Sequence, residues 1–182
     1  MANIRVMAPD DYDSVYDLWL NTPGMGLNST DDSRTGIEKY LRRNPTTSFV
    51  AECDAHIVGV IMAGHDGRRG YIYHTAVLPA YRNRGIARSL VEHTMAALEQ
   101  EGITKAALVA FSQNDLGNGF WERIGFTCRD DLVYRNKTSA PWRISPPQNR
   151  NRTLLNRFPP VLQRAGFFSP SAASLLPASS SS

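Results

Sequence analysis

The segment "VLPAYRNRGIARSL", residues 77–90, places two cations and a glycine where an apolar, strand-like run gives way to a helical pattern. The first backbone N–H groups of a helix lack intrahelical partners, and the helix dipole adds partial positive charge there. Gly85 lets a ligand approach the backbone closely, while Arg82 and Arg84 add full charges. The segment therefore favours an anion site, above all for phosphate, with a purely structural turn as the alternative.

Two other phosphate-binding motifs do not fit this sequence. GxxxxGK[ST] does not occur, and Gly117-Asn118-Gly119 lacks the third glycine and the preceding tight turn of a dinucleotide fingerprint. The kind of anion must therefore be inferred from the strands and helices that surround the segment.

Those elements alternate between strands and helices. The order is predicted to be βααβββαβαβ(β), an α/β class, with strands over 3–7, 48–53, 56–65, 71–78, 105–111 and within 126–136, and helices over 9–20, 29–43, 86–101 and 114–123. A right-handed helical crossover joins strands 71–78 and 105–111, so we expect them to be parallel neighbours. The run "KAALVAF" at 105–111 has the composition of a buried strand.

Two motifs resemble those of the GNAT N-acetyltransferase superfamily. "VLPAYRNRGIA" is similar to its [RQ]-x-x-G-x-[GA] acyl-CoA loop, with Arg82, Gly85 and Ala87 at the defined positions. "NDLGNGFWERIGF", residues 114–126, resembles its N-x-x-A-x-x-L-Y-x-x-x-G-F segment at the same spacing. The resemblance covers about residues 3–136 and points to small bacterial members of the superfamily.

This resemblance implies a GNAT fold, with a mixed central sheet splayed at the parallel pair and acetyl-CoA bound as cosubstrate in the splay. A bulge in strand 71–78 would free backbone groups for the pantetheine, and the loop would hold the pyrophosphate. The implied cofactor-binding residues are Ala76, Val77, Leu78, Arg82, Asn83, Arg84, Gly85, Ile86, Ala87, Asn114 and Trp121.

Amine acetylation requires a base, because a free alkyl amine with a pKa of about 10.4 is neutral in only roughly one molecule in 10³ at pH 7. His74 on the cofactor strand is one candidate, with a packed histidine as its alternative. Glu52 is a second, since family members often place a carboxylate there, with a solvated strand end as the alternative. Many members protonate the departing thiolate with a tyrosine. Trp121 occupies that position here, so either Tyr134 supplies the acid or the thiolate leaves unassisted.

The acceptor amine is expected under the loop of residues 21–32, near Trp19 and Met25. Strand alternation places Tyr71 and Tyr73 on the face opposite His74. His65 and Asp66 border a turn at the expected acceptor cleft, and Asp31 and Asp32 either attract a cationic amine or cap the following helix.

Charge and composition define the remaining expectations. The net charge is +3, but the five arginines after residue 140 account for it: the other 15 basic residues face 17 acidic ones, a balance of −2. This argues against nucleic acid as a partner. We expect a GNAT domain at 1–138 and a Pro/Ser/Arg-rich tail at 139–182, disordered or a non-native extension.

Cys53 and Cys128 have no metal-ligand spacing, which indicates free thiols in a reducing cytoplasm, with no metal and no membrane span. The predicted function is acetyl transfer from acetyl-CoA to a primary amine of a small molecule or a protein, by direct attack in a ternary complex. A non-catalytic acyl-CoA-binding regulatory module is the alternative, and a homodimer is compatible with either.

Overall fold

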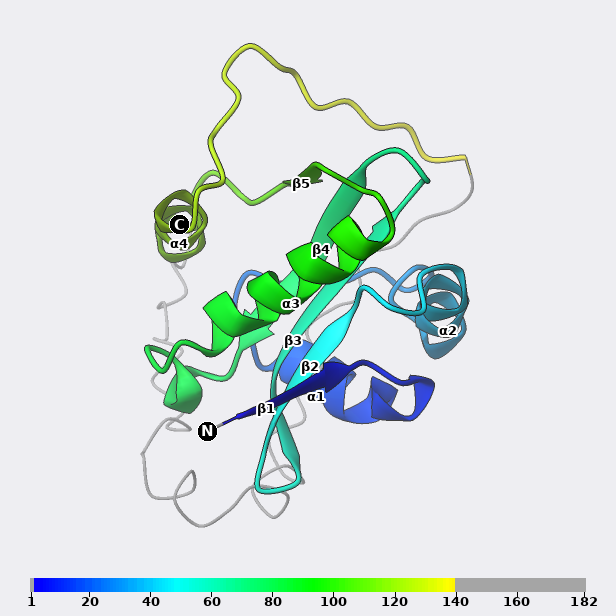
Figure 1. Ribbon diagram of the computed structural model, residues 1–182, viewed down its shortest axis with the longest axis vertical. Coiled ribbons are helices and arrows are strands. Elements are labelled where there is room, and N and C mark those ends of the chain that lie inside the picture. Colours follow the sequence, from blue (N-terminus) through cyan, green and yellow to red (C-terminus); the bar gives the residue numbers. More distant parts are fainter. Residues whose placement is uncertain (1, 140–182) are drawn as a thin grey trace, which may run out of the picture. The chain divides into compact units, whose positions relative to one another are not determined.

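A five-stranded mixed sheet organises residues 2–139, the part of the chain that the computed structural model describes (Figure 1). Its order β1-β2-β3-β4-β5 follows the sequence; the first three neighbouring pairs are antiparallel and β4–β5 is parallel, as predicted. The strands are β1 (Asn3–Val6), β2 (Phe49–Cys53), β3 (His56–His65), β4 (Gly70–Val77) and β5 (Ala106–Leu108). Residues 140–182, nearly all of the predicted tail, lie outside the described residues.

Helices cover both faces of this sheet. They are α1 (Tyr12–Leu20), α2 (Arg34–Arg43), α3 (Ile86–Gln100) and α4 (Asp115–Arg123), with short 3₁₀ turns η1 (Pro9–Asp11) and η2 (Pro79–Tyr81). A Cβ added to Gly59 would meet Ile86 and Leu90 of α3, whereas one added to Gly64 would meet Tyr40 of α2. The two glycines are five residues apart on β3, so α3 and α2 lie on opposite faces. Figure 1 shows α3 in front of the sheet, with α1 behind it.

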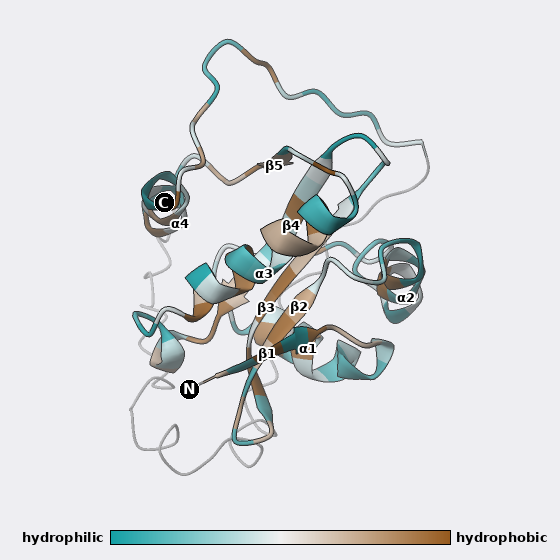
Figure 2. Cartoon of the chain, viewed as in Figure 1, coloured by the Kyte–Doolittle hydropathy of each residue, from teal (hydrophilic) through white to brown (hydrophobic). Residues whose placement is uncertain are grey.

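The core lies along β3, where residues 58–64 are all buried. Because helices cover both faces, this strand is a continuous apolar run instead of an alternating one, as the brown centre of the sheet in Figure 2 shows. Within the described residues, none of the helices is both long and apolar enough to cross a membrane.

A β-bulge interrupts β4 next to the predicted site. Val60 on β3 pairs with Ala76 and Met62 pairs with Tyr73, so two residues of β4, His74 and Thr75, oppose one residue of β3. A bulge places an unpaired residue in the ladder and re-aims its side chain. The bulge that the resemblance implied is therefore present, and His74 is part of it.

The carboxyl end of the parallel pair differs from the sequence prediction. β5 ends at Leu108, whereas a strand to Phe111 was expected, and Val109 and Phe111 are 57% and 62% exposed. No strand follows α4 within residues 2–139, although one or two were predicted at 126–136. Charged residues at 129–131 disfavour a strand there. Among residues 2–139, β5 therefore has one neighbouring strand, β4, which accounts for the partial exposure of β5.

Candidate active site

The loop between β4 and α3 leaves open space above its backbone. Gly85 is the residue before α3 and has φ +77°, a left-handed conformation that favours glycine. A Cβ built there meets no atom within 4 Å. Asn83 also has a positive φ, of 59°. The N–H groups at the start of α3, from Ile86 and Ala87 onward, are therefore accessible to an anion.

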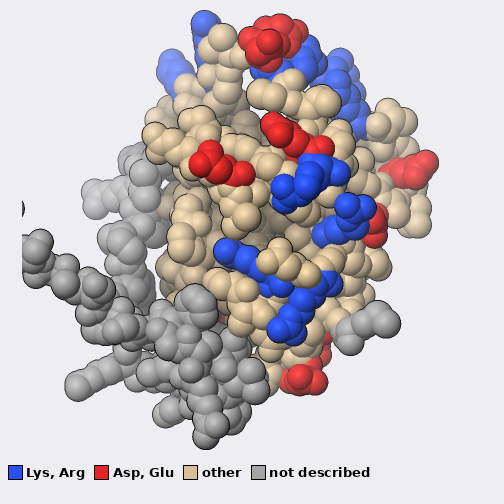
Figure 3. All heavy atoms as spheres, turned by 90° about the vertical axis from the view of Figure 1, so that its left-hand side faces the viewer, with Lys and Arg blue, Asp and Glu red and all other residues tan. Residues whose placement is uncertain are grey.

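Both arginines of this loop are held by backbone carbonyls. Arg82 donates from Nε to the Val77 carbonyl at 3.1 Å. Arg84 donates from Nη2 to the Ala80 carbonyl at 2.9 Å and lies over the Tyr81 ring at 5.1 Å. On the side of the molecule where α3 begins, Lys and Arg side chains gather around a hollow (Figure 3).

Within the described part of the chain, the edge of β4 near this loop is partly free. β5 pairs only with residues 70–72 of β4, so β4 continues beyond the parallel pair to Val77. Ala76 pairs with Val60 of β3, and the Leu78 N–H donates to the Val58 carbonyl at 2.9 Å. Leu78 therefore does not offer the free N–H expected from the sequence, because that group completes the ladder with β3.

The two α4 residues implied for cofactor binding serve the helix itself. Asn114 is the N-cap, and its Oδ1 accepts the Gly117 N–H at 3.0 Å. The Trp121 ring packs edge-on against Phe120 and Phe126, each with ring centroids 5.1 Å apart. Each side chain keeps one hydrogen-bond donor for a ligand, because Nδ2 of Asn114 and Nε1 of Trp121 make no hydrogen bond within the described residues.

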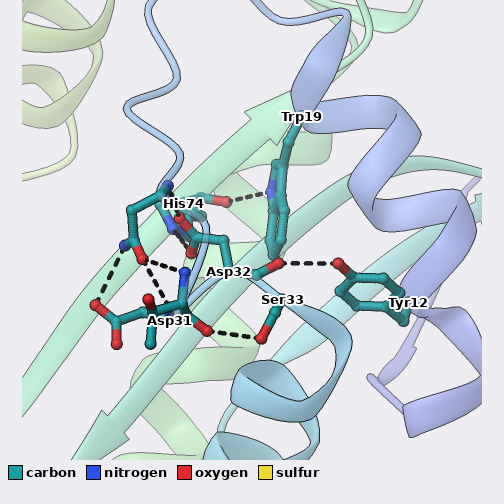
Figure 4. Close-up of polar contacts among 8 residues, drawn as sticks. Tyr12, Trp19, Asp31, Asp32, Ser33 and His74 are labelled. Carbon is teal, nitrogen blue, oxygen red and sulfur yellow. Dashed lines mark hydrogen bonds and ion pairs between the residues drawn. The ribbon is translucent and has the colours of Figure 1, made fainter. Parts of the chain in front are cut away.

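His74 lies where β4 bulges, in contact with two elements on the other side of the sheet from α3 (Figure 4). Its Nε2 is 2.6 Å from Oδ1 of Asp32, and its ring centroid is 4.9 Å from that of Trp19. The Trp19 Nε1–H donates to the His74 carbonyl at 3.3 Å. His74 has φ 38°, so its backbone is held in a conformation that is uncommon for a residue other than glycine.

Asp32 was expected either to attract an amine or to cap α2, and it does not cap α2. Its side chain is 4% exposed and is bound to His74. The N-cap of α2 is Ser33, whose Oγ accepts the Gly36 N–H at 3.1 Å. The sequence could not reveal the pairing of Asp32 with His74, because 42 residues separate them and only the bulge turns the histidine toward the acid.

The bulge also overturns the expected alternation of β4. The Tyr73 ring lies 6.0 Å from Tyr40 of α2 and 4.6 Å from Tyr71, while the His74 ring contacts Trp19 of α1. Tyr71, Tyr73 and His74 therefore face the same side of the sheet. Consecutive residues of a bulge can share a face, which simple alternation does not allow.

Tyr134 lies near this row of tyrosines. Burial raises the pKa of the Tyr71 and Tyr73 hydroxyls, and the nearby Tyr134 contributes to both rises. The Tyr134 side chain itself is exposed. The structure thus brings Tyr134 toward the face of the sheet that carries His74.

Glu52 lies elsewhere in the fold, on β2, two strands from β4. Its Oε2 accepts a hydrogen bond from Nε of Arg5 at 2.9 Å, and the same guanidinium binds both carboxylate oxygens of Asp11 at 2.7 and 2.8 Å. Glu52 therefore belongs to an ion-pair network at the β1 edge, separate from the contacts of His74.

The α1–α2 segment, residues 21–33, covers this side of the sheet. Leu27 and Asn28 are buried in it, and a Cβ on Gly26 would lie 3.3 Å from the ring of Phe111, just beyond β5. The segment therefore spans from α1 past His74 to the open end of the parallel pair.

The turn after β3 uses its polar groups internally. Oδ1 of Asp66 accepts the N–H groups of Arg68 and Arg69 at 2.8 Å each, and Nδ1 of His65 accepts the Gly67 N–H at 3.1 Å. No cluster of three or more potential metal ligands occurs among the described residues.

These features agree with a family match over most of the domain. Residues 12–126 match the family model described as acetyltransferase (GNAT) family. The chain belongs to the GNAT acetyltransferase family. An acetyltransferase of Sodalis glossinidius is 34% identical over 134 residues, covering 74% of this chain and 93% of the relative. The predicted fold and the predicted acyl-CoA-dependent acetyltransferase class are thus confirmed.

Solved structures share this GNAT fold. The PaiA N-acetyltransferase from Thermoplasma acidophilum, in complex with coenzyme A, aligns with a TM-score of 0.63 at 16% identity, covering 71% of this chain and 92% of its own. Ard1 from Thermoplasma volcanium aligns with a TM-score of 0.61 at 20% identity, covering 68% of this chain and 81% of its own. At these identities the likeness concerns the fold.

Proposed function

We propose that this GNAT protein transfers the acetyl group of acetyl-CoA to a primary amine, by direct attack in a ternary complex. The observation that carries the proposal is the position of His74. It lies in the bulge of β4, beyond the last residue that β5 pairs with, so its ring lies beside the open end of the parallel pair.

The proposed place for acetyl-CoA runs from α3 into this opening. The pyrophosphate would bind the N–H groups at the start of α3, where Gly85 leaves the backbone uncovered and Arg82 and Arg84 add positive charge. The pantetheine would follow the free edge of β4 near Ala76 and Val77. Coenzyme A in the similarly folded PaiA protein supports this choice of cosubstrate.

The proposed reaction needs one proton acceptor. The amine nitrogen attacks the thioester carbonyl carbon, a C–N bond forms, and the C–S bond breaks to release CoA thiolate. His74 takes the proton that the amine loses. We assign this role to His74 and not to Glu52, because Arg5 holds the Glu52 carboxylate two strands away.

The departing thiolate needs no strong acid. A thiol with a pKa of about 8.5 is a fair leaving group at neutral pH. Trp121 donates a hydrogen bond but does not practically give up its proton. Tyr134 lies toward the His74 face and is the proposed acid if one is used.

The proposed acceptor site lies between the α1–α2 segment and β4. Tyr71 and Tyr73 supply aromatic surface there, which suits an amine with an apolar or cationic body. Both a small amine and a protein amine remain candidates. The free thiols of Cys53 and Cys128 support the proposed cytoplasmic location, and a homodimer stays a prediction.

Release of CoA thiol tests the proposal. Purified protein is mixed with acetyl-CoA and a panel of amines, and both the thiol and the acetylated amine are measured. The proposal expects both products in equal amounts for at least one amine. Binding of acetyl-CoA without turnover of any amine would favour the regulatory-module alternative and contradict the proposal.

A further inference from the structure

His74 and Asp32 form a close pair in which the acid is buried and the histidine is partly exposed. The distance from Nε2 to Oδ1 is 2.6 Å, and the exposed fractions of the two side chains are 20% and 4%. Figure 4 shows the carboxylate of Asp32 pointing toward the histidine ring, beneath Trp19. A charge-assisted hydrogen bond at this distance fixes the direction of the ring as well as its place.

The other contacts of Asp32 determine which way the proton points. Oδ2 accepts the backbone N–H of Asn28 at 2.7 Å, so each carboxylate oxygen faces one nitrogen. An ionised carboxylate only accepts hydrogen bonds, so Nε2 of His74 must be the donor. In the neutral ring the lone pair is then on Nδ1, which makes no hydrogen bond within residues 2–139. The base must therefore act through Nδ1.

Two hydrogen bonds from helix α1 hold the backbone of the His74–Asp32 pair in place. The Tyr12 hydroxyl donates to the Asp32 backbone carbonyl at 2.9 Å, and the Trp19 indole N–H donates to the His74 carbonyl at 3.3 Å. The first holds Asp32 and the second holds the left-handed backbone of His74. Strained backbone that surrounding contacts maintain is found preferentially at functional sites.

We propose that Asp32 is the positioning residue of this acetyltransferase: it holds His74 in the Nε2–H form and leaves Nδ1 to accept the proton of the attacking amine. The inference rests on the function proposed above. When Nδ1 takes the proton, the ring becomes an imidazolium whose Nε2–H still faces the carboxylate, so Asp32 also stabilises the charge that forms. A buried acid also orients the catalytic imidazole of serine proteases, where the acid binds Nδ1–H and Nε2 is the base.

Few other ionisable groups face this pair. Asp31 precedes Asp32, is exposed, and accepts a hydrogen bond from Nδ2 of Asn28 at 3.2 Å. Tyr12 approaches from α1 and Tyr73 adjoins His74 on β4. Asp13→Asn is the matched control, because it makes the same chemical change at an exposed carboxylate that pairs with Arg34.

The test is Asp32→Asn, read by two measurements. The Asn28 N–H needs the single oxygen of the new amide, so the amide NH₂ must face Nε2. That donor forces the proton of His74 onto Nδ1 and removes the base. Nitrogen-15 NMR of the ring should therefore change from the Nε2–H to the Nδ1–H form. The kcat should fall roughly 10²-fold or more, with KM for acetyl-CoA and the melting temperature close to wild type.

The possible results distinguish a failure of the role assigned to Asp32 from a failure of the proposed function. An Nδ1–H ring in the wild type, or an unchanged tautomer in folded Asp32→Asn, would overturn the role of Asp32 whatever the activity. A shifted tautomer with unchanged kcat would overturn it as well. Failure of the wild type to acetylate any amine would instead contradict the proposed function. Should Asp32→Asn not fold, the wild-type tautomer alone decides, and Asp13→Asn should keep both tautomer and kcat.

Discussion

The indole Nε1–H of Trp19, on α1, donates to the backbone carbonyl of His74, on β4, at 3.3 Å. This bond links a fully buried tryptophan to the bulged residue with φ 38°. It explains why an otherwise unfavourable backbone conformation persists at this position.

Trp19→Phe should therefore affect both stability and catalysis. Phenylalanine keeps an aromatic ring but loses the N–H and part of the volume, which leaves a part-buried carbonyl without this donor and creates a small cavity. We expect a loss of about 1–3 kcal/mol in the free energy of unfolding, measured by urea denaturation, and a kcat reduced several-fold.

The control is Trp121→Phe, which also removes an indole N–H, but on α4. Because Trp121 contacts Phe120 and Phe126 and transfers no proton in the proposed reaction, its replacement should change kcat less than tenfold. A loss of 10³ or more in Trp121→Phe, with fold and CoA binding intact, would assign Trp121 a direct catalytic role.

Gly85→Glu should abolish binding of acetyl-CoA. A carboxylate would enter the open space at the start of α3 and repel the pyrophosphate. In the wild type, acetyl-CoA at a hundredfold its Kd should stabilise the protein by about 2.7 kcal/mol, seen as a rise in melting temperature. The variant should show no rise.

Gly67→Glu separates this effect from backbone strain. Gly67 also has a positive φ and open space around it, but it lies in the turn between β3 and β4. It should lose similar stability yet keep the response to acetyl-CoA. An equal rise in melting temperature with acetyl-CoA in both variants would contradict the placement of the pyrophosphate at the start of α3.

Asp11→Asn should lower stability at neutral pH and have little effect in acid. Burial alone would raise the pKa of Asp11, but Arg5 and the Ala8 N–H outweigh it, and the pKa lies below its ordinary value. A carboxyl whose pKa falls on folding stabilises the protein above the unfolded pKa, and this contribution is lost as the pH falls through the folded pKa.

The difference in melting temperature between wild type and Asp11→Asn should thus shrink below about pH 4. At pH 7 we expect Asp11→Asn to lower the free energy of unfolding by less than about 1 kcal/mol, because its partner Arg5 is only half-buried. Asp13→Asn, at an exposed ion pair with Arg34, is the control and should show a smaller difference. A difference that grows in acid would contradict the assignment.

A chain ending at Ser139 should keep the thermal transition and the response to acetyl-CoA. We propose this because the predicted GNAT domain ends at residue 138 and the five strands found within residues 2–139 all end by Leu108. Scanning calorimetry with and without acetyl-CoA compares the shortened chain with the full chain. Loss of the transition would show that the domain depends on residues beyond 139.

Local signals explain what the sequence could predict. Gly85 and Gly102 flank α3 and both have a positive φ, and β3 spans the predicted residues 56–65 because its apolar run is unbroken. The strand expected at 126–136 did not form within the described residues, since pairing depends on a neighbour that local sequence does not specify.

The site depended on contacts that local patterns do not carry. His74 was identified by its type and strand, but the bulge turned it away from the expected face. Asp32 was read as part of a helix start, whereas a tertiary contact made it the partner of His74. Glu52 was chosen by its position in a strand, which does not reveal that Arg5 binds its carboxylate.

The pH dependence of acetyl transfer in the wild type and in His74→Ala tests the central claim most directly. Release of CoA thiol, with the best amine of the panel, is followed from pH 6 to 9 for both proteins. We predict that His74→Ala still binds acetyl-CoA but loses turnover most strongly at low pH, where neutral amine is scarcest, by about 10²-fold. A pH profile and rate equal to the wild type would contradict the claim that His74 accepts the proton of the amine.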